Sequence, residues 1–188
     1  MPTTTTIMIC GVGGQGAVLA ADILARCAMA YGQDVKISEI HGMSQRGGAV
    51  TTIIRVGEEV SSMVASPGSV DYLLGFETTE ALRNIHYLSP TGTLIVNDQT
   101  IQPLSVLSGA AKPASGVRKS LVDRGAHMID AVRFAAQAGS IKAANIVMLG
   151  ALSAYLPYPE DLWVQTISRR VPAKFLQSNL AAFAAPRQ

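Results

Sequence analysis

Six residues near the start of the chain, from Gly11 to Gly16, have the types and spacing that let a peptide backbone approach a phosphate group. A short apolar run precedes them and a helix is predicted to follow, which is the strand–loop–helix context of the GxGxxG dinucleotide fingerprint. Glycines allow the tight turn, and the helix N-terminus adds partial positive charge. Glu39 follows at roughly the 20-residue spacing at which such folds place an acidic ribose ligand. The predicted binding residues of this first loop are Gly11, Gly13, Gly14, Gln15 and Gly16.

Two other interpretations of the first loop differ in their consequences. Gly11 and Gly16 have the spacing of a P-loop, but Ala17 and Val18 stand where Lys and Ser or Thr are needed, so nucleotide hydrolysis by that mechanism is excluded. The glycine turn could also serve only to bring the first helix close to the sheet. Taken alone, the loop favours a bound NAD or FAD.

A second polar glycine loop follows the second predicted strand and consists of Ser44, Gln45, Arg46, Gly47 and Gly48. Its guanidinium group is a planar fork suited to carboxylate or phosphate, and its glycines let the backbone bend close to a ligand. Loops after the first and second strands of a doubly wound sheet open at the same carboxyl edge. We therefore expect the two glycine loops to line one crevice, although an exposed turn with a solvated Arg46 is the simpler alternative.

The elements that would position these loops alternate between strand and helix in the first half of the chain. Strands are predicted at 7–10, 35–40, 49–56, 72–76 and 93–97, and a turn at 57–59 predicts a hairpin completed by 60–64. Helices are predicted at 18–30, 78–85, 129–138, 141–155, 160–170 and 172–183, and 99–116 is left unassigned. This order predicts one α/β domain over residues 1–188, Rossmann-like, with a mostly parallel sheet, a β-hairpin insertion and a helical C-terminal part.

Composition excludes several classes of function. The 188 residues carry a net charge of +2, too small to indicate a nucleic-acid or acidic-membrane partner, and the basic cluster at 118, 119 and 124 is interpreted as a solvated loop. Only 15% of residues are charged, against about 25% in typical domains, which favours a surface partly buried in a partner. The two cysteines, Cys10 and Cys27, cannot supply the four thiolates of an iron–sulfur cluster, and no metal site is expected. With no secretory signal and no long apolar run, the expected location is cytoplasmic.

Together, the motifs resemble the γ subunit or γ domain of 2-oxoacid:ferredoxin oxidoreductases, and within that family the small subunit of indolepyruvate ferredoxin oxidoreductase. The resemblance runs in order through nearly the whole chain. It covers the segments 11–16, 44–48 and 71–77 with Glu80 and Ala81, then Gly92 with Asn97, 145–151, and Asn179 with Ala182 and Phe183. The chain departs from the family pattern at Pro186–Gln188, where a further glycine is absent.

The resemblance implies a chain that completes an enzyme and is not active alone. Thiamine diphosphate and [4Fe–4S] clusters would reside in a large partner subunit, which oxidatively decarboxylates an arylpyruvate and passes electrons to ferredoxin. Coenzyme A would take the acyl group, and its phosphates could use the glycine loops and Arg46. A homodimer or a heterotetramer of large–small pairs is implied, with no catalytic residue and no metal on this chain. Two alternatives remain open: a stand-alone dinucleotide-binding module using Glu39, and a purely structural, dimerising subunit.

Overall fold

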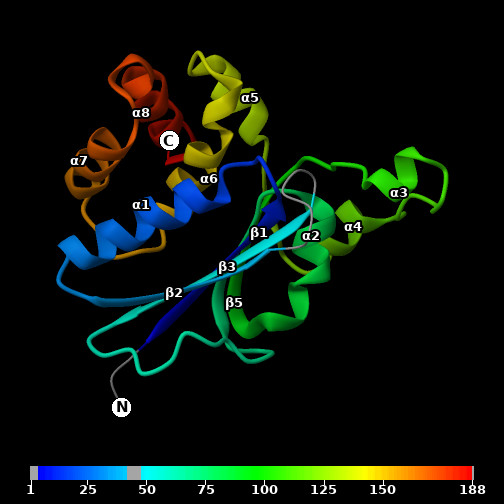
Figure 1. Ribbon diagram of the computed structural model, residues 1–188, viewed down its shortest axis with the longest axis horizontal. Coiled ribbons are helices and arrows are strands. Elements are labelled where there is room, and N and C mark those ends of the chain that lie inside the picture. Colours follow the sequence, from blue (N-terminus) through cyan, green and yellow to red (C-terminus); the bar gives the residue numbers. More distant parts are fainter. Residues whose placement is uncertain (1–3, 42–47, 188) are drawn as a thin grey trace.

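The computed structural model describes residues 4–41 and 48–187, except for the side chains of residues 41, 104 and 105. Within that part of the chain, six strands form one sheet in the order β2-β3-β1-β4-β5-β6 (Figure 1). Three neighbouring pairs, from β1 to β6, are parallel, and β3 runs antiparallel to both of its neighbours. The predicted α/β fold is confirmed. The strands are β1 (Thr5–Val12), β2 (Asp34–His41), β3 (Ala49–Gly57), β4 (Val70–Gly75), β5 (Leu88–Asn97) and β6 (His127–Ile129).

The β-hairpin lies one strand earlier than the sequence indicated. Residues 60–64 form no strand, so the hairpin predicted there is wrong. Instead β2 pairs with β3, from Asp34 opposite Gly57 to His41 opposite Val50. Arg55 donates to the carbonyl oxygen of Ser62 at 2.8 Å, so a side chain rather than a strand ladder holds the segment after β3.

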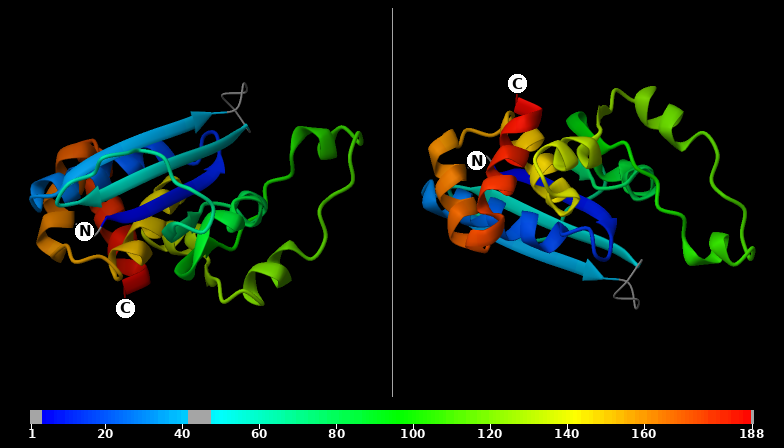
Figure 2. Two further views of the ribbon diagram at one scale, coloured as in Figure 1. Left: turned by 90° about the horizontal axis from the view of Figure 1, so that it is seen from below. Right: turned by 90° about the horizontal axis from the view of Figure 1, so that it is seen from above.

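Helices cover the two faces of the sheet unequally (Figures 1 and 2). Successive residues of β1 face opposite sides: Ile7 and Ile9 join the core under one helical layer, and Met8 and Cys10 join the core under the other. The first layer contains α1 (Ala17–Ala30), α5 (Ala131–Gln137), α6 (Ala144–Ser153), α7 (Glu160–Arg170) and α8 (Leu176–Ala184), and the second contains α2 (Thr78–Arg83) and α4 (Val117–Val122). Short 3-10 turns lie at η1 (Ile85–Tyr87), η2 (Ile141–Ala143), η3 (Ala173–Phe175) and η4 (Ala185–Arg187).

Helix α6 is the centre of the first layer. Every residue of α6 after Ala144 is buried, and Gly150 lies where α8 crosses it. A Cβ atom on Gly150 would be 2.2 Å from the carbonyl oxygen of Phe183, so only glycine permits this crossing. This contact places the segments 145–151 and 182–183 against each other.

The region from 99 to 129 differs most from the sequence interpretation. The basic cluster does not form a loop, because Arg118 and Lys119 lie on α4, where they pair with Asp98 at 2.8 Å and Asp123 at 2.6 Å. Strand β6 was not predicted, and α5 begins after Asp130, whose side chain accepts a hydrogen bond from the N–H of Arg133. Helix α3 (Leu104–Leu107) lies in an arm that projects from the body (Figure 2).

Candidate functional site

The side chain of Gln15 fixes the shape of the first glycine loop. Its Oε1 accepts a hydrogen bond from the N–H of Val12 at 2.9 Å, and its Nε2 donates to the carbonyl oxygen of Phe76 at 2.9 Å. A Cβ on Gly11 would lie 2.6 Å from that Oε1, so glycine is needed for the amide to reach the backbone. Gln15 therefore ties the carboxyl end of β1 to the carboxyl end of β4, and much of its hydrogen-bonding capacity is used within the protein.

Two glycines of the same loop adopt left-handed backbone conformations, with φ of 99° at Gly14 and 78° at Gly16. Gly16 is the N-cap of α1, and its carbonyl oxygen accepts a hydrogen bond from Asn145 Nδ2 at 3.2 Å. A Cβ on Gly16 would lie 2.6 Å from that nitrogen. The loop thus brings the N-termini of α1 and α6 side by side.

The two glycine loops meet at the carboxyl edge of the sheet. The N–H of Gly13 donates to the carbonyl oxygen of Gly48 at 2.8 Å. The two loops therefore reach the same edge of the sheet, as predicted. Gly48 is not among the residues that line the pockets at this edge, so a crevice lined by both loops stays a prediction. Four of the predicted binding residues lie outside the described residues: Ser44, Gln45, Arg46 and Gly47.

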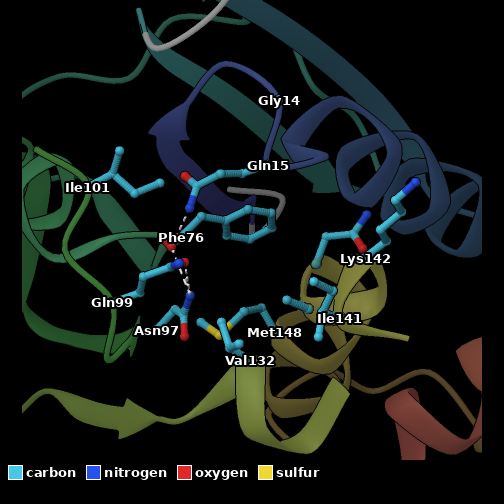
Figure 3. Close-up of a pocket in the computed structure, with 12 residues that line it drawn as sticks. Gly14, Gln15, Phe76, Asn97, Gln99, Ile101, Val132, Ile141, Lys142 and Met148 are labelled. Carbon is cyan, nitrogen blue, oxygen red and sulfur yellow. Dashed lines mark hydrogen bonds between the residues drawn. The ribbon is translucent and has the colours of Figure 1, made fainter. Parts of the chain in front are cut away.

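A two-part crevice opens at this edge, next to the first loop, and Figure 3 shows the first of its two pockets. One pocket, of about 230 Å³, lies between the ends of β1, β4 and β5 and the starts of α5 and α6. A second pocket, of about 390 Å³, lies between the starts of α1, α6 and α8. The residues that line both are Gly14, Gln15, Lys142 and Asn145. The first pocket is at the point where the chain leaves β1 for one side of the sheet and returns as β4 on the other, which is the usual ligand position in open α/β sheets.

Lys142 gives the crevice its charge. Among the described residues that line the two pockets, Lys142 is the single charged one, and no carboxylate accompanies it. Lys142 is exposed, so its ammonium group remains accessible to a ligand. The two helix N-termini at Gly16 and Asn145 add partial positive charge to the same place. The arrangement suits an anion such as a phosphate or a carboxylate.

Side-chain amides stabilise the walls of the crevice. Asn97 Nδ2 donates to the carbonyl oxygen of Phe76 at 3.1 Å, and Asn97 Oδ1 accepts from the N–H of Ala131 at 3.2 Å. Asn97 thereby joins the ends of β4 and β5 to the start of α5 beneath the pocket (Figure 3). The sequence interpretation did not assign Asn97, Asn145 or Lys142 to a binding site, because they come from segments far from either loop.

Glu39 lies farther from β1 than a dinucleotide fold would place it. The antiparallel strand β3 separates β1 from β2, whereas the fingerprint depends on a directly adjacent parallel strand. Glu39 still lines a groove of about 620 Å³ with Gly16 and Arg170. Arg170 is also bound to Asp22 at 2.5 Å, so ion pairing links α1 to α7 along this groove.

The described residues offer no fit to a metal cluster. They contain no group of three or more His, Cys, Asp or Glu side chains arranged to hold a metal ion. Both thiols are buried, and burial raises the pKa of Cys10 above its ordinary value and that of Cys27 to about 12. Helices in the described part of the chain are all too short or too polar to cross a membrane.

Known proteins share this architecture and much of this sequence. Residues 6–188 match the pyruvate ferredoxin/flavodoxin oxidoreductase family. The chain is 39% identical to indolepyruvate oxidoreductase subunit IorB of Thermococcus kodakarensis, over 94% of this chain and 91% of the relative, and 34% identical to the protein of that name from Methanothermobacter thermautotrophicus, over 94% and 93%. The γ subunit of a keto/oxoacid ferredoxin oxidoreductase from Geobacter sulfurreducens superposes with a TM-score of 0.71 at 25% identity, over 97% of this chain and 95% of that one.

The fold and the ordered motifs define a small subunit of the 2-oxoacid:ferredoxin oxidoreductase class. The chain belongs to the pyruvate ferredoxin/flavodoxin oxidoreductase family. The resemblance found from the motifs is therefore confirmed, and the chain is a subunit of an oxidoreductase complex.

Proposed function

We propose that this chain completes an arylpyruvate:ferredoxin oxidoreductase by packing against a large subunit that holds thiamine diphosphate and [4Fe–4S] clusters. The observation that carries the proposal is the positively charged crevice at the edge where the two glycine loops meet. In this proposal the crevice binds the phosphates of coenzyme A, which takes up the acyl group released by the partner. The four relatives named as indolepyruvate oxidoreductase subunits favour an aryl substrate over pyruvate.

The chemistry of the crevice supports a role in binding rather than in bond breaking. Lys142 and the N-termini of α1 and α6 supply positive charge, and Leu19, Val171 and Phe175 supply an apolar wall in the second pocket. A ligand with phosphates at one end and an apolar or aromatic portion at the other would satisfy both. Lys142 would hold an anionic group as a point charge, with the helix N-termini contributing backbone donors.

Catalysis by this chain alone is not part of the proposal. Gln15, Asn97 and Asn145 carry side-chain amides that line the pockets, and each is hydrogen-bonded to the backbone. Amides that are hydrogen-bonded in this way hold the walls of the crevice in place and do not transfer protons. The electron-transferring groups would all belong to the partner.

Co-expression with the candidate large subunit, followed by an anaerobic assay, tests the proposal. The readout is coenzyme A-dependent reduction of a viologen dye with indolepyruvate, phenylpyruvate, pyruvate or 2-oxoglutarate. We expect activity only when both chains are present, and greatest activity with an aryl substrate. Full activity of the large subunit alone, or no association between the chains, would contradict the proposal.

The coenzyme A contact is tested by Lys142→Ala in the assembled complex. Loss of a charged contact worth about 1.4 kcal/mol should raise the KM for coenzyme A about tenfold, while kcat stays within about twofold. Lys119→Ala is the matched control, because Lys119 is exposed on α4 and pairs with Asp123 away from the crevice. An unchanged KM for coenzyme A in Lys142→Ala would contradict the binding of coenzyme A in the crevice. A yellow purified protein absorbing near 450 nm would instead favour a flavin dinucleotide.

A further inference from the structure

The segment between β5 and α4 forms an arm that projects from the body of the protein and is largely exposed. The docking arm, residues 102–116, extends away from the body in both views of Figure 2. All of residues 107–116 are exposed, and Leu107 is 70% exposed. Long loops of this kind in compact domains are usually functional, because an unpacked segment contributes little to the core.

The arm nevertheless has a defined local structure. Pro103 precedes α3, and the N–H groups of Val106 and Leu107 donate to its carbonyl oxygen at 2.9 and 3.1 Å. Gly109, with a φ of 77°, ends the turn, as glycine does after many helices. The result is a helical turn on which Leu107 is exposed.

The base of the arm is fixed beside the crevice. The N–H of Thr78 donates to the carbonyl oxygen of Gln99 at 2.9 Å, and the Thr78 and Thr100 hydroxyl groups are 2.6 Å apart. Gln99 and Ile101 line the first pocket. The arm therefore leaves the body of the protein beside the crevice.

Charge identifies the kind of surface that would receive the arm. Lys112 is the single charged residue in the sequence from 99 to 116, so the arm complements neither a strongly acidic nor a strongly basic surface. The groove lined by Asp22, Glu39 and Arg170 on a second copy of this chain is a poor recipient, since an arm whose single charge is Lys112 would desolvate these side chains with little compensation.

We propose that the arm inserts into an apolar, weakly charged groove of the large partner subunit beside the crevice, with Leu107 as its anchor. This inference rests on the proposed function, because it names where the same partner binds. Apolar side chains that fill pockets at the centre of an interface carry a large share of its affinity.

The test measures association of the full-length chain with the large subunit. Leu107→Asp should weaken association about tenfold or more, because it would place an unpaired carboxylate in the groove. Its far-UV circular dichroism and Tm should not change, since Leu107 makes no core contact. Met29→Asp is the matched control: Met29 is 62% exposed on α1, whose end lies on the other side of the molecule from the arm in Figure 1.

A photo-crosslinking residue at position 107 supplies the second readout. We expect crosslinks to the large subunit from position 107 and not from position 29. Wild-type affinity in Leu107→Asp, or crosslinks from position 107 only to a second copy of this chain, would overturn the inference and leave the proposed function intact. Absence of any association of the wild-type chain would overturn the proposed function itself.

Discussion

The crossing of α6 and α8 at Gly150 gives a quantitative prediction for Gly150→Ala. The added Cβ would sit 2.2 Å from the carbonyl oxygen of Phe183, 3.0 Å from its carbonyl carbon and 3.1 Å from Pro186 Cγ. The close partner is backbone, so no side-chain rotation relieves the clash, and α8 must move by roughly 1 Å to reach ordinary contact distance.

The expected cost combines two opposing effects. Overpacking a buried site costs about 1–3 kcal/mol, and occasionally more. Alanine is a better helix former than glycine by about 1 kcal/mol, which offsets part of that cost. Because α6 is buried along its length, we expect the overpacking term to reach the upper part of its range. The net loss in the free energy of unfolding should be about 2 kcal/mol, equivalent to a fall in Tm of about 4–8 °C for a chain of this size.

Thermal unfolding followed by circular dichroism measures the effect. The matched control is Gln177→Ala, which also ends in alanine on a helix but lies at an exposed position of α8. Its Tm should change by less than about 2 °C. A Gly150→Ala variant as stable as the wild-type chain would show that α6 and α8 do not approach as closely as described, and the reasoning would fail.

Three further predictions concern buried polar groups. Glu77 is buried, and its carboxylate caps α2 by accepting hydrogen bonds from the N–H groups of Thr79 and Glu80. Glu77→Ala should therefore lower the free energy of unfolding, measured by urea titration, by about 2 kcal/mol. Glu58→Ala, at an exposed position, should leave it unchanged. Burial raises the pKa of the Glu80 carboxyl, against the opposing effect of Arg83 and with a further rise from Glu77. The folded protein therefore retains a proton on Glu80 where the unfolded chain has lost it, and stability should fall as pH rises from the ordinary carboxyl pKa through the raised one. Glu80→Gln should flatten that part of the stability–pH curve and Glu58→Gln should not; parallel curves for Glu80→Gln and wild type would contradict the assignment. Cys10 and Cys27 should resist a thiol reagent at pH 8 in the folded chain and both react in denaturant, because burial keeps the thiols neutral; rapid labelling of the native chain would refute this.

The sequence predicted most of the fold where hydrophobic pattern and breakers agreed. Helix 160–170 is confirmed residue for residue, since Pro159 precedes it and acidic and basic residues occupy its first and last turns. Hairpin partners were misassigned because β2, β3 and the apolar residues at 60–64 have similar local preferences, and only long-range register distinguishes them. Strand β6 has three residues, too few for a periodic signal, and its pairing with β5 is decided by the sheet.

The candidate site could be predicted only in part for a related reason. Glycine-rich loops are recognisable from composition, so the sequence placed Gly13 and Gly48 at one edge of the sheet. A hydrogen bond joins them there. Lys142 follows no motif, and it reaches the crevice only because α6 packs across the sheet with Asn145 bound to Gly16. The role of Gln15 was likewise hidden, since its partner, Phe76, is distant in sequence.

The position of β1 in the middle of the sheet has a consequence for how the chain acquires its structure. Ile7 pairs with Ile54 on one side and Tyr72 on the other, so β1 lacks its first partner until β3 has been made and its second until β4 has been made. Contacts of such long sequence separation slow folding, because the loop must close before the pairing stabilises anything. Four residues of β1 are fully buried in the folded protein and are exposed until β1 has paired: Ile7, Met8, Ile9 and Cys10. The chain is therefore prone to aggregation in the interval before β3 and β4 have been made, and production at lower temperature or with chaperones should raise the yield of folded protein.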